Sequence, residues 1–326
     1  MKLASLKRGG RDGTLVVVSP DLQNAVTVPS IAATLQQALE TWDRSAPELS
    51  KVYEQLKAGR SSDSFALRAE DLASPLPRAF QFLDGSVYLH HMEKARKARG
   101  AAMPPNYKTE PLMYQGLSDR FDGPRDPMRF SDEELGLDYE PEVAVVLDDV
   151  PMGTSMAQTG SHIRLIMLMN DYTLRTLTRS ELPKGFGFLQ AKPTSSFSPV
   201  AVTPDELGDA WDGTRVSLPL VSSLNGKVVG RANAGHDMFF DYPQLIAHAA
   251  RTRGLSAGTI LGAGAVANKD PATGHACLAE VRADEELANG VPTTPWLRFG
   301  DQVRIEMFDA ENRSVFGAID QRIAKA

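Results

Sequence analysis

The sequence predicts a mixed, β-rich α/β fold in which a small N-terminal α+β domain precedes a larger domain. Two helical patterns occur close to the N-terminus. After about residue 78, short apolar runs separated by turn residues dominate, and one clear helix interrupts them. Strands do not alternate regularly with helices, as they would in a doubly wound parallel sheet. We therefore expect domains at 1–78 and 79–326, the second mostly antiparallel, and the chain of 326 residues is long enough for both cores.

The N-terminal domain is expected to contain a strand and a pair of helices. The apolar run 15–18 predicts the strand. A second helix is predicted by the capping box of Ser45 and Glu48, and it should end at Gly59. Ser30 can cap the first helix, whose apolar face repeats at helical spacing through Ile31, Leu35, Leu39 and Trp42.

Two hairpins are expected in the larger domain. The dipeptide Asn225-Gly226 favours a tight turn between strands at 215–224 and 227–230. Near the C-terminus apolar residues alternate with polar ones through Val303, Ile305 and Met307, and residues 314–319 can pair back with this strand. Consecutive strands joined in this way form antiparallel sheets.

One helix and one glycine-rich segment lie between these hairpins. Asp241 is expected to cap the helix, which should end at Gly254. Residues 262–265, Gly-Ala-Gly-Ala, resemble a nucleotide-binding loop, but the loop 268–271 follows them. A dinucleotide site needs a helix N-terminus there to hold the pyrophosphate, so we reject that interpretation.

The composition argues against several classes of protein. The net charge is −6 and no stripe of basic and aromatic residues occurs, so we expect no nucleic-acid partner. The basic cluster 94–99 indicates either a solvated helix face or a contact for an anionic substrate. The single cysteine, Cys277, excludes an intrachain disulfide and suits a buried apolar position. Apolar runs are too short for a signal peptide or a bilayer span, so we expect a cytoplasmic protein that does not bind membranes.

Three acidic residues flank apolar strands. Glu140 and Glu142 lie two residues apart at a strand start, so both carboxylates point to one face. Two adjacent carboxylates repel each other, and a cation between them would relieve that cost. Asp171 follows the apolar run 163–170, where a strand would hold it while a ligand reaches it. A solvated strand face for the glutamates and a turn residue for Asp171 remain the alternatives.

A histidine and two further charged residues could complete a site. If residues 84–91 are helical, Asp84 and His91 project from one face, and the histidine could act as a base. Lys192 could stabilise developing negative charge. Glu280 lies among apolar neighbours and could be a buried partner of His91. Each of these residues has a purely structural alternative: a turn, a core or surface histidine, a solvated loop lysine, and an exposed strand residue.

Taken together, these motifs resemble the fumarylacetoacetate hydrolase family. The resemblance covers nearly the whole chain and is firmest from about residue 79 onward. Several motifs in the right order are far more specific than one. The segments that carry it are Asp84 with His91, 114–116, 138–142, Asn170-Asp171, 184–188, 258–260, 277–280 and 299–301.

The resemblance implies a role for each candidate residue. Metal ligands fall on Asp84, Glu140, Glu142 and Asp171, the general base on His91, its orienting acid on Glu280, the charge-stabilising lysine on Lys192, and substrate contacts on Tyr114, Arg175 and Thr259. An all-oxygen set favours Mg²⁺ or Ca²⁺ over zinc. The family also implies a β-rich catalytic domain behind a smaller N-terminal domain, and a homodimer.

The resemblance further implies metal-dependent hydrolysis of a C–C bond in a 1,3-diketone or acylpyruvate. We expect fumarylacetoacetate, cleaved to fumarate and acetoacetate in tyrosine and aromatic catabolism. The alternatives are a fumarylpyruvate or acylpyruvate hydrolase, an isomerase, an oxaloacetate decarboxylase, a sugar-acid dehydratase, or a non-catalytic metal-stabilised binding protein. Two departures concern the substrate: Thr178 replaces a glutamine of the animal enzymes, and no arginine aligns after His91, although Arg96 and Arg99 are near.

Overall fold

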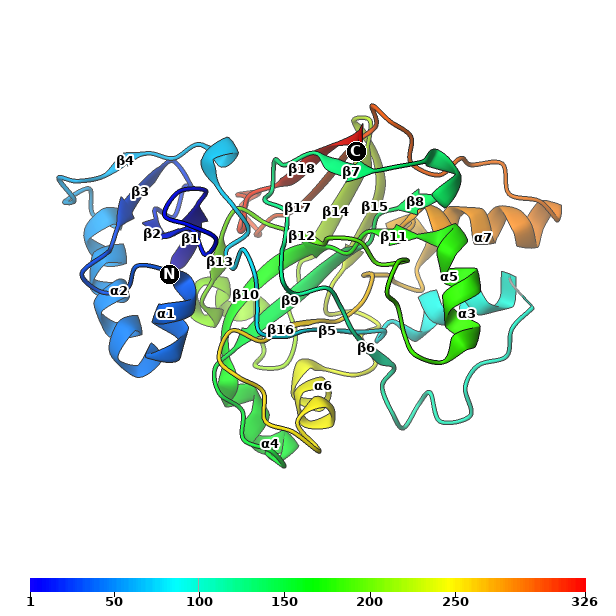
Figure 1. Ribbon diagram of the computed structural model, residues 1–326, viewed down its shortest axis with the longest axis horizontal. Helices are drawn as coiled ribbons and strands as arrows, with labels where there is room; N and C mark the ends of the chain where they lie inside the picture. Colours follow the sequence, from blue (N-terminus) through cyan, green and yellow to red (C-terminus); the bar gives the residue numbers. More distant parts are fainter. Residues whose placement is uncertain (99) are drawn as a thin grey trace.

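The computed structural model describes residues 1–98 and 100–326, and two large sheets form its centre (Figure 1). Strand pairs are antiparallel except β16 with β5 and β18 with β7, among the described residues. This confirms the expected β-rich, mostly antiparallel fold. The first sheet runs in the order β4 (Phe65–Ala66), β3 (Asn24–Thr27), β2 (Thr14–Val18), β1 (Lys2–Leu6), β13 (Ala201–Val202), β10 (Ile163–Asn170), β9 (Pro141–Leu147), β16 (Ile260–Gly262), β5 (Phe82–Gly85) and β6 (Met113–Gln115), with β12 (Ser196–Phe197) beside β10.

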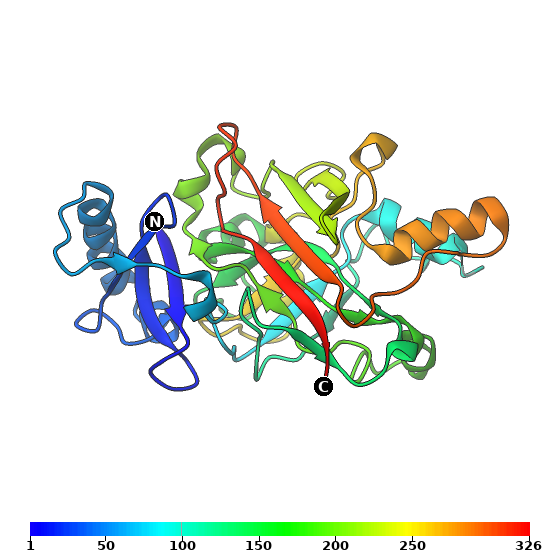
Figure 2. The same cartoon turned by 90° about the horizontal axis from the view of Figure 1, so that it is seen from above.

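The second sheet lies over the first, as the view from above in Figure 2 shows. A separate two-stranded sheet pairs β8 (Leu137–Asp138) with β11 (Thr173–Leu174). In the chain, β8 comes directly before β9, and β11 comes directly after β10. The order of the second sheet is β15 (Lys227–Asn233), β14 (Pro219–Leu224), β17 (Gln302–Met307), β18 (Ile319–Lys325) and β7 (Met128–Phe130). The helices are α1 (Leu35–Glu40), α2 (Trp42–Lys57), α3 (Leu89–Ala98), α4 (Met156–Thr159), α5 (Arg175–Glu181), α6 (Tyr242–Ala249) and α7 (Leu278–Asn289).

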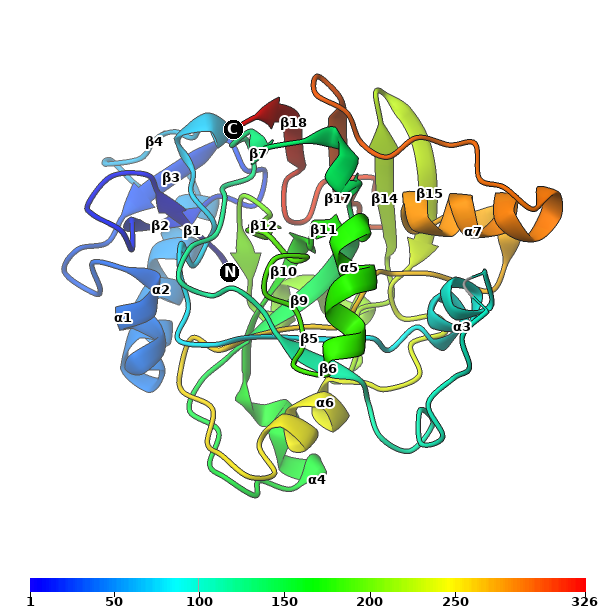
Figure 3. The ribbon, with the colours of Figure 1, turned by 45° about the vertical axis from the view of Figure 1, so that its right-hand side comes forward.

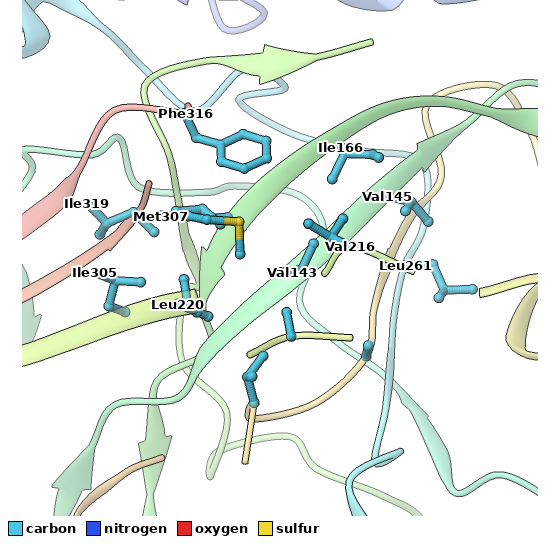
Figure 4. Packing of buried hydrophobic residues seen from close by; sticks show 14 of the residues in the cluster. Val143, Val145, Ile166, Val216, Leu220, Leu261, Ile305, Met307, Phe316 and Ile319 are labelled. Carbon is cyan, nitrogen blue, oxygen red and sulfur yellow. The ribbon is translucent and has the colours of Figure 1, made fainter. Parts of the chain in front are cut away.

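The core between the sheets depends on the alternation of side chains along β9 and β10. Val143, Val145 and Ile166 point toward the second sheet and meet Leu220 and Ile305 from it (Figure 4). The intervening residues of the same strands point the other way, into a second core with α1 and α2. Each fully buried aliphatic side chain contributes about 1.5–3 kcal/mol, so these central strands are held firmly on both faces.

The first N-terminal helix begins later than the sequence predicted, and the second begins earlier. Thr34, not Ser30, caps α1, and its side chain accepts a hydrogen bond from the N–H of Gln37. Trp42 belongs to α2 and not to the first helix. Ser45 lies inside α2, where its hydroxyl bonds that of Thr41 at 2.7 Å, so the expected capping box does not form. The strand at 15–18 is confirmed as part of β2.

Strand β1 was not predicted, because Lys2 and Ser5 make its pattern look polar. Both side chains are nevertheless buried, since Lys2 Nζ donates to the carbonyl of Val315 at 2.7 Å and Ser5 Oγ to that of Pro75 at 2.7 Å. β1 pairs with β2 on one side and with β13 on the other. One continuous sheet therefore runs from the N-terminal segment into the rest of the molecule.

The expected turn at Asn225-Gly226 is confirmed. The expected C-terminal hairpin is confirmed only in part. Both turn residues have positive φ, 51° and 78°, as a tight hairpin turn requires. β17 pairs with β18 and not with residues 314–319. Phe308 and Ser314 form a single bridge, and the buried ring of Phe316 follows it, so this segment is a packed loop before the strand.

Helices α3, α5, α6 and α7 lie beside the two sheets (Figure 1). Asp241 caps α6 as expected and forms a capping box with Gln244, but the helix ends at Ala249, before Gly254. α3 packs beside α7, and α5 lies near them at the same end of the molecule (Figure 3). Within residues 1–98 and 100–326, no helix has both the length and the apolar composition that a membrane span needs.

Candidate active site

Three buried carboxylates meet where the ends of β5, β9 and β10 lie together. Oxygen atoms of Asp84, Glu142 and Asp171 all lie within 4.8 Å of one another. The strand register explains this, because Gly262 of β16 pairs with Asp84 on one side, and Met169 of β10 lies opposite Glu142. The residues that sequence analysis selected from three distant segments therefore converge.

Two glycines make room for these carboxylates. A Cβ atom built on Gly262 would collide with Asp84 Oδ1 and with the methyl group of Met169. Gly264 has a φ of 91°, and its N–H donates to Glu142 Oε2 at 2.9 Å and to Asp84 Oδ1 at 3.2 Å. Sequence analysis considered this segment only as a nucleotide loop. Two glycines directly after a buried strand were the signal for close approach of other groups.

Asp84, Glu142 and Asp171 form a carboxylate trio, in which Asp84 and Glu142 make no ion pair among the described residues and Asp171 is paired with Lys192. Burial, together with the charge of Asp171, raises the pKa of Asp84 to about 8. Burial and the neighbouring Asp84 also raise the pKa of Glu142 well above its usual range. Glu142 Oε1 is buried and has no hydrogen-bond partner among the described residues. Three convergent oxygen donors and one free buried oxygen fit a hard divalent cation.

Glu140 lies beside the trio but is already paired. Its carboxylate contacts Lys192 Nζ at 2.5 Å, Arg175 Nη2 at 2.8 Å and the hydroxyl of Thr173 at 3.1 Å. Burial alone would raise the pKa of Glu140, but Arg175 and Lys192 together hold it below the usual range. The expected fourth ligand is therefore an ionised carboxylate next to the trio, within 4.8 Å of His91 and Cys277.

Lys192 connects Glu140 to the trio. Its ammonium donates to Glu140 Oε2 and Asp171 Oδ2, each at 2.5 Å, and lies 5.5 Å from the centre of the Tyr114 ring. Burial opposes its charge, but Asp171 and Glu140 raise its pKa above the usual range, so it stays cationic. The hydroxyl of Ser195, which sequence analysis missed, donates to the other oxygen of Asp171 at 2.7 Å.

Arg175 is held in place by Asp138, a second residue that sequence analysis missed. Arg175 Nε and Nη2 donate to Asp138 Oδ2 at 3.0 and 2.8 Å. The Asp138 carboxylate also accepts from the backbone N–H groups of Leu278 and Ala279, each at 2.9 Å, at the start of α7. Arg175 was expected to contact substrate, but its guanidinium is engaged with Asp138 and Glu140.

His91 and Glu280 come from the first turns of two helices, α3 and α7. Asp84 lies on β5, so the expectation that Asp84 and His91 share one helix is wrong; the chain turns between the strand and α3. His91 Nδ1 lies 3.5 Å from Glu280 Oε1. Burial opposes ionisation of Glu280, yet His91 and the N–H of Ala276 lower its pKa to about 2. Glu280 is thus a buried helical carboxylate, not an exposed strand residue.

The basic residues of the cluster 94–99 differ in their contacts. Lys94 Nζ donates to Asp284 Oδ2 at 3.1 Å and lies 3.8 Å from Glu280 Oε1. Lys97 is exposed. Arg96 donates to the carbonyl of Ala102 at 2.8 Å. Arg99 lies outside the described residues.

Models of two protein families together match nearly the whole chain. The model described as fumarylacetoacetate (FAA) hydrolase C-terminal matches residues 81–324. The model described as fumarylacetoacetase N-terminal domain 2 matches residues 1–78. The chain belongs to the fumarylacetoacetate hydrolase family. The resemblance seen in the sequence motifs is thereby confirmed. A search of curated proteins finds no match.

Solved structures with the same fold have low sequence identity to this chain. A candidate HpcE protein from Mycobacterium smegmatis is 19% identical with a TM-score of 0.70, over 100% of both chains. Maleylpyruvate hydrolase from Sphingobium sp. SYK-6, in complex with manganese(II) and pyruvate, is 16% identical with a TM-score of 0.65, over 100% of both chains. A 5-carboxymethyl-2-hydroxymuconate delta-isomerase from Mycobacterium smegmatis is 15% identical with a TM-score of 0.61, over 100% of this chain and 99% of the other.

The hydroxyl groups of Thr259 and Thr178 bond nearby backbone carbonyls and not the carboxylate trio. The backbone of Thr259 bonds that of Leu147, at the end of β9 opposite to Glu142. Leu147 lies five positions along the strand from Glu142, a distance of roughly 17 Å. The hydroxyl of Thr259 donates to the carbonyl of Ser256 at 2.7 Å. Thr259 thus lies away from the trio, and its role as a substrate contact stays a prediction. Thr178, which replaces the family glutamine, bonds the carbonyl of Arg175 within α5 at 2.7 Å.

Proposed function

We propose that this protein is a divalent-metal-dependent hydrolase that cleaves a C–C bond in an acylpyruvate or related 1,3-diketone. One observation carries the proposal: the carboxylate trio, the cationic Lys192 and the His91–Glu280 pair all border one site. A metal-ligand set alone would not need a histidine with a buried acid behind it. Maleylpyruvate hydrolase, which shares the fold, was solved with manganese(II) and pyruvate, and this supports the substrate class.

Asp84, Glu142 and Asp171 would hold the cation, with Glu140 as the nearest further carboxylate. Mg²⁺, Ca²⁺ or Mn²⁺ bound there would polarise the dicarbonyl and favour its enolate form. Oxygen donors of this kind suit hard cations better than soft ones. Tyr114, whose hydroxyl donates to Asp171 Oδ2 at 2.5 Å, fixes the orientation of that carboxylate.

His91 is the proposed general base. Its Nδ1 faces Glu280, so Nε2 is free to take a proton from water as the water oxygen bonds to the carbonyl carbon. The carbonyl electrons move to oxygen and then return, which expels the neighbouring carbon as an enolate. His91 gives its proton to that carbon, and an acid and a ketone result. Glu280 stabilises the imidazolium while it carries the proton.

Lys192 is the proposed oxyanion donor. An ammonium has three N–H donors, and Lys192 uses two of them on Glu140 and Asp171. The third can donate to the developing oxyanion, with the position of Nζ fixed by the two carboxylates. Arg175 keeps Glu140 in place from the other side. Substrate contact by Arg175 would require it to leave Asp138.

A substrate panel tests the function. Purified protein loaded with Mg²⁺, Ca²⁺ or Mn²⁺ is assayed on fumarylacetoacetate, maleylpyruvate, acetylpyruvate and oxaloacetate, with products identified by mass spectrometry. Hydrolysis of the diketones, with ¹⁸O from water in the new carboxylate, is the expected result. We place fumarylacetoacetate first among them. No diketone cleavage with any of the three ions would refute the proposal.

An isomerase is the second candidate, because an isomerase also shares the fold. Isomerisation moves a proton between carbons of the same enolate and needs no activated water. His91 and Glu280 would then shuttle the proton. Conversion of a hydroxymuconate-type substrate with no ¹⁸O uptake would favour this candidate over hydrolysis.

A further inference from the structure

A second hollow lies on the far side of β5 and β6 from the carboxylate trio. Its volume is about 540 Å³. Along β5 and β6, the paired residues Asp84 and Tyr114 point toward the trio, so their neighbours Leu83 and Met113 point to the opposite face. Leu83 and Met113 line the hollow. Figure 3 shows α6 on this side of β5 and β6, with the loop that follows α5 descending toward the same place.

The rim of this hollow is basic. His248 at the end of α6, and Arg251 and Arg253 just after it, line one side. Both arginines are exposed, and neither makes an ion pair within residues 1–98 and 100–326. None of the described residues that line the hollow is acidic. Unpaired guanidinium groups over an apolar floor suit a carboxylate that carries a carbon chain, because an arginine fork matches a carboxylate in shape and charge.

The opposite rim carries an aromatic ring in full contact with solvent. Phe186 is 100% exposed, between Gly185 and Gly187, both at positive φ. The base of this loop is closed by Glu181, whose carboxylate accepts from the N–H groups of Gln190 and Ala191 at 2.8 and 2.9 Å. Two aromatic residues of this loop, Phe186 and Phe188, thus line the hollow.

The hollow is joined to the active site through one side chain. Tyr114 is among the residues that line the hollow, and its ring packs edge-on against that of Phe188, with the ring centres 5.1 Å apart. The hydroxyl of the same tyrosine bonds Asp171. A ligand in the hollow therefore lies one aromatic ring away from the carboxylate trio.

We propose that this hollow binds the carboxylate end of an unsaturated organic acid. Arg251 and Arg253 hold the carboxylate, Leu83 and Met113 contact the carbon chain, and Phe186 stacks on its planar part. The acid is either the distal end of the substrate or a separate acid that resembles the product. That the acid is the distal end of the substrate rests on the proposed function. The binding site itself does not rest on it.

Direct binding tests the site without turnover. Fumarate is titrated by calorimetry into the full-length protein in the presence of a chelator, so that no ion at the trio can hold it. We expect the double substitution Arg251→Met and Arg253→Met to weaken binding about tenfold or more, and Phe186→Ala to weaken it about threefold. The control Arg231→Met removes an exposed arginine from β15 in the other sheet and should leave binding unchanged. Absence of fumarate binding to the wild type, or wild-type affinity in the double variant, overturns the proposal.

Kinetics identify the source of the carboxylate. For the metal-loaded enzyme, the double variant should raise KM for maleylpyruvate about tenfold and leave KM for acetylpyruvate, which lacks the distal carboxylate, unchanged. If fumarate binding is lost but both KM values stay constant, the ligand is a separate acid. If no diketone is cleaved while fumarate binding still depends on the arginines, the proposed function fails and the site stands. A lower Tm in the double variant with fumarate binding retained would mean that the arginines only stabilise the end of α6.

Discussion

The roles that we propose for single side chains of the candidate site are of two kinds, cation binding and proton transfer. Asp84 and Glu142 make no ion pair among the described residues and Asp171 is paired with Lys192, whereas Glu140 is paired with both Lys192 and Arg175. His91 lies apart from the trio and faces Glu280. Removal of one group should therefore affect one function and spare the other, which makes the roles separable by experiment.

Replacement of His91 by alanine removes only the proposed base. We expect kcat to fall about a hundred- to ten-thousand-fold, the range that general base catalysis provides. Affinity for Mn²⁺, measured by calorimetry, should stay at the wild-type value, because His91 is not in the trio. Unchanged turnover on the substrates of the panel would exclude His91 as the base.

Replacement of Glu142 by glutamine removes a charged oxygen from the trio. The side chain keeps its size, and Gly264 N–H can still donate to the amide oxygen. We expect affinity for Mg²⁺ or Mn²⁺ to fall at least tenfold, because a neutral amide is a weaker ligand for hard cations. Calorimetric titration measures this, with circular dichroism to check the fold. Wild-type affinity would show that Glu142 is not a ligand.

Glu280 should make stability depend on pH in the acid range. Its folded pKa of about 2 lies below the ordinary value of 4.5, so its carboxylate stabilises the fold fully above pH 4.5, and the contribution is lost as the pH falls toward 2. Urea denaturation between pH 2 and 5 should show a steeper loss for the wild type than for Glu280→Gln. Equal slopes would mean that Glu280 is no better stabilised as an anion in the folded protein than in the unfolded one.

At the scale of elements, α3 and α7 form a ladder of charged contacts behind the proposed base. Glu280 and Asp284 lie one turn apart on α7, and His91 and Lys94 lie one turn apart on α3. Lys94 touches both acids, and His275 Nε2 approaches Asp284 Oδ2 to 2.9 Å. The ladder fixes α3, and with it the imidazole, relative to the site.

Lys94 should therefore act as a positioning residue for His91. We expect Lys94→Met to lower kcat about tenfold with little change in KM, and Lys94→Arg to restore part of the loss, since the arginine keeps the charge. The exposed Lys97 on the same helix gives a matched control, Lys97→Met, with no effect. A loss of Tm without a change in kcat would indicate a purely structural ion pair.

Several features could be predicted from the sequence because they depend only on residues that are close in the sequence. Glu140 and Glu142 share a face since a strand alternates, and the turn at Asn225-Gly226 forms since both residues accept positive φ. Other elements depend on contacts distant in sequence. β1 contains buried polar residues that distant carbonyls satisfy, and the role of Gly264 becomes visible only when β5 and β9 bring their acids to it. Asp84 and His91 lie on two elements, which their spacing of seven does not show.

At the scale of the whole molecule, we propose a homodimer, as family membership suggests. The surface carries large exposed apolar side chains, among them Phe80, Met152 and Met156, at 69%, 65% and 55% exposure. Association would cover such surface and gain its hydrophobic free energy. Sedimentation equilibrium should give about twice the chain mass of 35.4 kDa. A mass of one chain across micromolar concentrations would contradict the proposal.

The continuous sheet that runs through β1 and β13 limits how this protein can be shortened. β1 covers the open side of β13 with backbone hydrogen bonds, and β2 to β4 extend the sheet outward. Removal of residues 1–78 would bare a row of N–H and C=O groups and part of the apolar surface that α1 and α2 cover. Exposed strand edges of this kind recruit other chains. The N-terminal segment thus covers the edge of the sheet at β13, and we expect a fragment of residues 79–326 to aggregate.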